Sequence, residues 1–296
     1  MNRSSRRGGL GAALAALKSS LQWRIVLLWI LATLVPTLLV ATPLWLALQE
    51  QFSHSPFAGE IAAGKNLPLL FQGFGKVGEQ GGGWLFTGLA GGGVLMLLVS
   101  PWLTGMVVAS LRARRRLGLG ELMHGGLAEY WRMLRMMLWS LLPLGLALMV
   151  GGGVSGAMAK GVEGAVLASD VESASRTGMI VMLVVFVLAH ATVEAGRGWL
   201  GADTALRSVV KAWWRGLKLL LRRPLATLLV YVVAGIAGYG LALLFAWLRF
   251  KVDGVGSSAF ILSFLCGQAI VAALAWGRIA RLYGMADLAA DRLART

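Results

Sequence analysis

The chain has 296 residues, of which 57% are apolar and only 14% are charged. Soluble domains are on average about 45–50% apolar and about 25% charged. This composition therefore excludes a soluble enzyme, a secreted disulfide scaffold and a disordered chain. The single cysteine, Cys266, excludes an intrachain disulfide and a cysteine metal cluster. We expect an all-α, polytopic integral membrane protein.

Six apolar stretches are long enough for a membrane-spanning helix, which needs about 20 mostly apolar residues. They cover residues 25–48, 84–110, 136–157, 178–196, 225–248 and 257–277. The second and third stretches each contain a glycine triplet, at 91–93 and 151–153. Intramembrane glycine favours close helix packing. The alternative is a broken helix that lines a substrate path, as transporters use.

The basic residues indicate the orientation of these helices. Most of the 28 lysines and arginines lie before the first span, between spans 2 and 3, between spans 4 and 5, or after the last span. The positive-inside rule then places both termini in the cytoplasm and requires an even number of spans. We expect a multi-pass protein of the bacterial inner membrane, with a basic cytoplasmic tail at 1–24 and one six-helix transmembrane domain at 25–296.

Two cytoplasmic connections, 119–135 and 204–222, carry apolar residues at the spacing of one helical face. The pattern begins again at 282–293. Short basic amphipathic helices lie in the headgroup layer, where lysine and arginine attract anionic lipid. The basic side chains of the second connection that we expect to face lipid are Arg207, Lys211, Arg215, Lys218, Arg222 and Arg223.

A common signature accompanies these three segments: an arginine followed six residues later by an acid, with a glycine between them. The pairs are Arg115 and Glu121, Arg197 and Asp203, and Arg281 and Asp287. We expect the arginine to lie where a span leaves the membrane, the glycine to permit a bend, and the acid to cap the surface helix. The signature predicts three helical hairpins at 25–135, 136–222 and 223–296. The alternative is coincidence in a chain rich in arginine and glycine.

The second surface segment ends in a basic cluster before a new span begins, at Leu221, Arg222, Arg223 and Pro224. This order of exit arginine, surface helix, basic cluster and new span resembles poorly characterised bacterial six-helix proteins. Those proteins are similar to the membrane domain that precedes some glycerophosphodiester phosphodiesterases. The resemblance covers about residues 100–290 and implies a fold. It implies no activity, because no phosphodiesterase domain with acidic metal ligands is present.

The best chemical candidates are His190, Glu194 and Arg197, which share one face of the fourth span. Ionisable residues at membrane depth are costly and often functional, so these side chains indicate a proton relay, a cation site or a polar substrate site. The alternative is structural: Glu194 and Arg197 pair at the cytoplasmic boundary, and His190 donates a packing hydrogen bond. Two ligands on one helix are too few for a metal site.

The sequence lacks the metalloprotease His-Glu-x-x-His motif, the Walker A loop and the Gly-x-Ser-x-Gly elbow. We therefore expect no enzyme activity and no cofactor. The 12 tryptophans mostly lie near span ends, as in an aromatic belt, and do not indicate nucleic-acid binding. The favoured hypothesis is a non-catalytic subunit or scaffold that packs with other membrane proteins or with itself. The alternative is a permease or lipid-handling transporter that uses His190 and Glu194.

Overall fold

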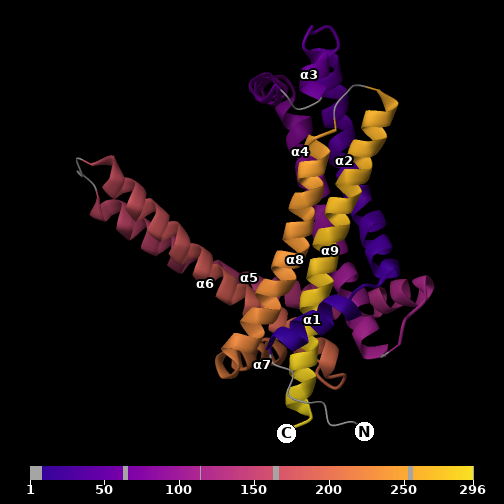
Figure 1. The fold of residues 1–296 in the computed structure, drawn as a ribbon, viewed down its shortest axis with the longest axis vertical. Helices are drawn as coiled ribbons and strands as arrows, with labels where there is room; N and C mark the ends of the chain where they lie inside the picture. Colours follow the sequence, from indigo (N-terminus) through magenta and orange to yellow (C-terminus); the bar gives the residue numbers. More distant parts are fainter. Residues whose placement is uncertain (1–8, 63–65, 114, 163–166, 253–255, 296) are drawn as a thin grey trace.

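The computed structural model describes residues 9–62, 66–113, 115–162, 167–252 and 256–295, and within these ranges all regular structure is helical. The all-α prediction is confirmed. Figure 1 shows the helices, whose bounds are as follows. They are α1 (Gly9–Ser19), α2 (Trp23–Phe52), α3 (Ala58–Ala62), α4 (Leu67–Ala113), α5 (Leu119–Gly161), α6 (Ala168–Ala202), α7 (Val209–Arg222), α8 (Pro224–Phe250) and α9 (Ser257–Leu293).

Six of these helices are long and apolar enough to cross a membrane, which confirms the polytopic fold. They are α2, the Thr87–Ala113 part of α4, α5, α6, α8 and α9. Each of the six helices contains one predicted stretch, although the span within α4 begins at Thr87 and not at residue 84.

The helices separate into two arms that share one base (Figure 1). Helices α2, α4, α8 and α9 run along the long axis toward α3 and contact one another. Helices α5 and α6 pair as an antiparallel hairpin that leaves this group at an angle (Figure 1). Helices α1 and α7 and the last turns of α9 lie at the base, from which both arms extend (Figure 1).

The base also holds most of the fully buried large apolar side chains. Five different helices contribute fully buried side chains, each 0% exposed, to the base: Met106, Met136, Leu200, Leu219 and Ile279. Along the arms, by contrast, large apolar side chains remain uncovered by the rest of this chain. This division is expected when lipid covers the arms and protein packing stabilises the base.

The predicted surface helix at 119–135 is helical, but it is the first part of the continuous helix α5. No glycine or proline lies between residues 127 and 142, so nothing in this stretch ends the helix. Its apolar face is covered in part by this chain itself, because Leu122 and Met133 are buried.

The third predicted surface segment, 282–293, likewise continues α9, and the bend expected at Gly284 is absent. A Cβ at Gly284 would lie 2.4 Å from Val230 Cγ1, so this glycine permits close packing against α8 instead. Of the three predicted surface segments, only 204–222 contains a separate helix, α7. Ser208 begins it by accepting a hydrogen bond from Lys211 N, and Pro224 begins α8 directly after it.

Part of the predicted basic tail is folded. Residues 9–19 form α1, which packs against α8 and α9. Ala12, Ala13 and Ala16 are buried in this contact, and their small side chains let α1 approach closely. Helix α1 thereby joins the base instead of extending from it.

The glycine triplets support packing rather than a broken helix, because α4 and α5 continue through both of them. A Cβ at Gly92 would lie 2.4 Å from Val40 Cγ2 of α2, and one at Gly151 would lie 2.8 Å from Met182 Cα of α6. One glycine of each triplet thus permits close approach of the neighbouring helix. Gly93 instead has open space beside it.

Candidate functional site

The structure brings His190, Glu194 and Arg197 together near the base, where α6 separates from α8. Arg197 Nη1 donates to Glu194 Oε1 at 2.5 Å, and His190 Nε2 lies 3.7 Å from the same oxygen. Their spacing of three and four residues places them on one helical face. Glu194 is 1% exposed and Arg197 is 9% exposed. The pair that the structural alternative expected is therefore present, and it is buried inside the protein.

His190 connects α6 to α8. Its Nδ1 atom lies 2.8 Å from the Tyr231 hydroxyl, and the two rings meet edge to face. Phe186, one turn earlier on α6, stacks on the other side of the imidazole. The His190 side chain is 24% exposed, so this bridge is only partly covered by the chain.

Helix α9 adds two arginines, Arg278 and Arg281, whose charges act on Glu194. The Arg278 guanidinium lies over the Trp29 ring at 5.5 Å and donates to Thr104 Oγ1 at 3.2 Å. The Arg281 guanidinium lies over the Tyr231 ring at 5.3 Å. Within the described part of the chain, neither arginine forms an ion pair with a carboxylate.

These residues, which we call the charge cluster, are His190, Glu194, Arg197, Tyr231, Arg278 and Arg281. The cluster holds three guanidinium groups and one carboxylate. Two of its buried atoms, Glu194 Oε2 and Arg281 Nε, have no hydrogen-bond partner. Buried polar atoms are normally paired, so the cluster has unused capacity both to accept and to donate a hydrogen bond.

A second set of charges joins α4, α5 and α6. Arg112 donates to the Leu200 carbonyl through Nε at 3.1 Å and Nη2 at 2.5 Å, and it also pairs with Glu129. Arg132 pairs with the same carboxylate at 2.7 Å. Arg112 thus satisfies a carbonyl near the end of α6, where backbone acceptors lack helical partners. Of these contacts, only the Glu129–Arg132 pair could have been recognised in the sequence, from its three-residue spacing.

The three arginine–acid signatures adopt three different arrangements. Arg115 pairs with Glu121 at 2.6 Å, and Glu121 accepts from Gly118 N at 2.8 Å, so this acid caps α5 as expected. The hydrogen bonds that Arg115 donates to the Glu121 carboxylate raise the pKa of the exposed Arg115 side chain above its ordinary value. At the second signature, Asp203 pairs with Arg215 at 2.8 Å, while Arg197 pairs with Glu194.

The third signature lies within α9: Arg281 belongs to the charge cluster, and the helix continues through Asp287 without a bend. The expected capping role therefore applies to Glu121 and not to Asp287. Asp203 instead lies at the end of α6, where it accepts a hydrogen bond from Ala205 N at 3.0 Å.

The basic residues of the second connection divide into two groups. Arg207, Lys211, Lys218 and Arg222 are exposed. Arg215 and Arg223 are partly buried, and Arg223 pairs with Asp291 of α9 at 2.7 Å. The exposed group therefore remains available to lipid headgroups, whereas Arg215 and Arg223 stabilise the base.

No group of three histidine, cysteine, aspartate or glutamate side chains suited to a metal ion occurs among the described residues. The charge cluster also contains no serine, cysteine or lysine nucleophile. Its chemistry is that of a fixed, positively charged polar core. Comparison with protein-family models, curated proteins and solved structures finds no match for this chain.

Proposed function

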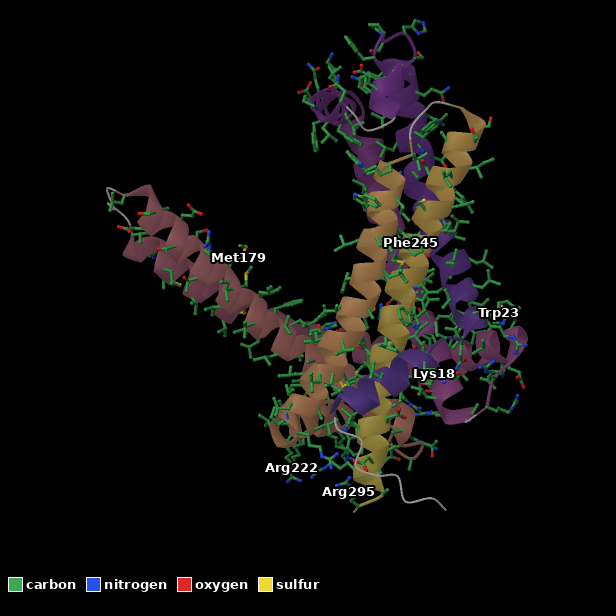
Figure 2. The ribbon with its side chains drawn as sticks, viewed as in Figure 1. Lys18, Trp23, Met179, Arg222, Phe245 and Arg295 are labelled. Atoms are coloured by element: carbon green, nitrogen blue, oxygen red, sulfur yellow. The ribbon has the colours of Figure 1, made fainter. Side chains whose placement is uncertain are left out.

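We propose that the protein is a non-catalytic subunit or scaffold of a complex in the bacterial inner membrane, with both termini in the cytoplasm. The observation that carries this proposal is the uncovered surface of the α5–α6 hairpin. The hairpin stands apart from α8 and α9, as Figure 2 shows for the parts that carry Met179 and Phe245. Leu142, Leu146 and Met149 of α5 are 62%, 63% and 75% exposed.

One face of α5 is suited to another helix. Gly145, Gly152 and Gly156 are seven and four residues apart and therefore share this face. A Cβ added to any of them would meet no atom within 4 Å. Gly152 and Gly156 also form a Gly-x-x-x-Gly pair, which permits two helix backbones to approach closely in lipid.

The hairpin already uses glycine in this way on its inner side. A Cβ at Gly178 of α6 would lie 3.1 Å from Ser155 Cα of α5. The inner glycines thus face a helix of this chain, and the outer glycines face none among the described residues. A transmembrane helix of a partner protein, or of a second copy, is the occupant that this geometry favours.

The basic face of the base supports the expected cytoplasmic orientation and a contact with anionic lipid. Lys218 Nζ lies over the exposed Trp214 ring at 5.5 Å, which places a cation and an aromatic side chain together on the outer surface of α7. This combination is typical of segments in the headgroup layer. Each well-placed basic side chain contributes about 1 kcal/mol to binding of an anionic membrane.

A permease or lipid-handling transporter is the second candidate. The favouring observation is that His190 and Glu194 face the interior and that His190 contacts Tyr231 of another helix. Buried ionisable groups shared between helices mark many substrate paths. The strong pairing of Glu194 with Arg197 ranks this candidate second, because a fixed ion pair is less free to exchange protons or ligands.

Gly152→Leu tests the scaffold proposal. The new side chain has open space in this chain but would block close approach of another helix. We expect proteins that co-purify stoichiometrically with the wild type in mild detergent to be lost, while the variant stays folded and monodisperse. Gly267→Leu is the matched control, since Gly267 of α9 has equally open surroundings. Equal recovery of partners with both variants would contradict the proposal.

A further inference from the structure

The charge cluster is electrically unbalanced. Glu194 is the only carboxylate in it, and Oε1 of this residue already accepts from Arg197. Arg278 and Arg281 lie against aromatic rings instead of carboxylates. A cation–π contact compensates only part of the free energy that a charge loses on leaving water. Two guanidinium groups in the base therefore lack an anionic partner from the described part of this chain.

The His190–Tyr231 side of the cluster is only partly covered by the chain. The bridge between His190 and Tyr231 lies where α6 leaves α8, and both side chains are only partly buried. Arg281 lies directly against the ring of Tyr231, and its Nε is buried without a hydrogen-bond acceptor. An anion that enters beside this bridge would reach an arginine whose donor is unused.

The surroundings of this bridge are apolar. Leu183 of α6 and Ile236 of α8 are 58% and 68% exposed on the two helices that diverge from the bridge (Figure 1). Lipid acyl chains fit such a surface, since they need no polar partner. The guanidinium group is planar and donates two parallel hydrogen bonds, a geometry that matches the oxygens of a phosphate group.

We infer that Arg281, next to the charge of Arg278, binds the phosphate group of an anionic ligand at the divergence of α6 from α8. The ligand is a phospholipid headgroup or a free phosphate compound. The inference does not depend on the partner proposed for the α5–α6 hairpin, because it concerns the isolated chain. Glu194 pairs with Arg197, so neither Arg278 nor Arg281 receives a carboxylate partner from the cluster.

The test measures thermal unfolding of the purified full-length protein in a neutral detergent, with three probes: phosphatidylglycerol, phosphatidylcholine and inorganic phosphate. We expect phosphatidylglycerol to raise the unfolding midpoint and phosphatidylcholine to have little effect. Arg281→Gln should need at least about tenfold more phosphatidylglycerol for the same shift, because a charge-assisted hydrogen bond is lost. Arg176→Gln, a change at an exposed arginine at the far end of the hairpin, should behave as the wild type.

Inorganic phosphate distinguishes the two ligand sources. Competition by millimolar phosphate would assign a free phosphate compound, and protection by phosphatidylglycerol alone would assign a lipid. Arg281→Lys keeps the positive charge but lacks the planar guanidinium group. It is measured in place of Arg281→Gln if that variant does not fold. Equal phosphatidylglycerol binding by the wild type and both Arg281 variants would overturn the inference. Loss of binding in Arg222→Gln alone would overturn it as well, since the lipid would then bind the surface of α7.

Discussion

Glu194→Gln removes the only negative charge of the cluster while keeping the length of the side chain. The pair that it breaks is buried, with 1% of the Glu194 and 10% of the Arg197 side chain exposed. Removing one partner of a buried ion pair costs about 3–5 kcal/mol, and the glutamine oxygen retains a hydrogen bond worth about 1 kcal/mol. We therefore expect the free energy of unfolding to fall by about 2–4 kcal/mol.

Glu172→Gln is the matched control, because it removes the partner of Arg176 from another pair on α6. That pair spans 3.2 Å and has side chains that are 74% and 69% exposed. Exposed helical pairs contribute about 0.3–0.5 kcal/mol, so this variant should lose several-fold less stability. Both variants are measured by denaturant titration in detergent micelles, followed by tryptophan fluorescence.

A double-variant cycle gives the stronger test. Arg197→Gln should cost less than Glu194→Gln, because Arg278 and Arg281 still act on the Glu194 carboxylate. The double variant should recover part of the loss, since the uncompensated partner is also removed. If Glu194→Gln costs no more than Glu172→Gln, or if the two cluster variants are additive, Glu194 is not the buried counter-ion of this cluster.

Three further predictions concern the fold. Gly216→Leu should abolish monodisperse protein in size-exclusion chromatography, because its Cβ would lie 2.5 Å from Gly196 N, whereas Gly235→Leu has open space and should elute as the wild type. Glu121→Ala should weaken the cap of α5 and speed hydrogen exchange in its first turn only. A reporter at the carboxyl terminus should be cytoplasmic and one within 55–75 should be outside; the reverse result would refute the orientation.

The six membrane helices were predictable because their signal is local. A run of about 20 apolar residues is sufficient to identify a span, whatever it packs against. The glycine triplets were also informative, since Gly92 and Gly151 do make the close contacts that intramembrane glycine permits. Which glycine of a triplet faces a neighbour was not predictable, because it depends on the rotation of the helix.

Helix ends were less predictable than helices. An apolar face at helical spacing shows that 119–135 is helical, but the same pattern occurs in a separate surface helix and in the extension of a span. The two cases differ by the presence of a helix end. Ser208 and Pro224 provide such ends for α7. No equivalent residue separates 119–135 from the rest of α5, so the continuous helix was the better interpretation of that stretch.

The candidate site divides in the same way. His190, Glu194 and Arg197 were predicted together because one helix holds them, whereas Tyr231 and Arg281 join them only through the packing of α8 and α9. In the sequence, an arginine at the end of a span is counted only as evidence for the cytoplasmic side.

The structure shows that basic residues near the ends of spans occupy two different environments. Lys211 and Arg222 are exposed on α7, whereas Arg278 and Arg281 are partly buried against the rings of Trp29 and Tyr231. Both groups contribute equally to a topology count, but only the second group is partly removed from solvent. How many of these arginines are partly buried without a carboxylate partner depends on the packing of the base. It is therefore at the base, and not in the total charge of the chain, that an anionic ligand should be sought.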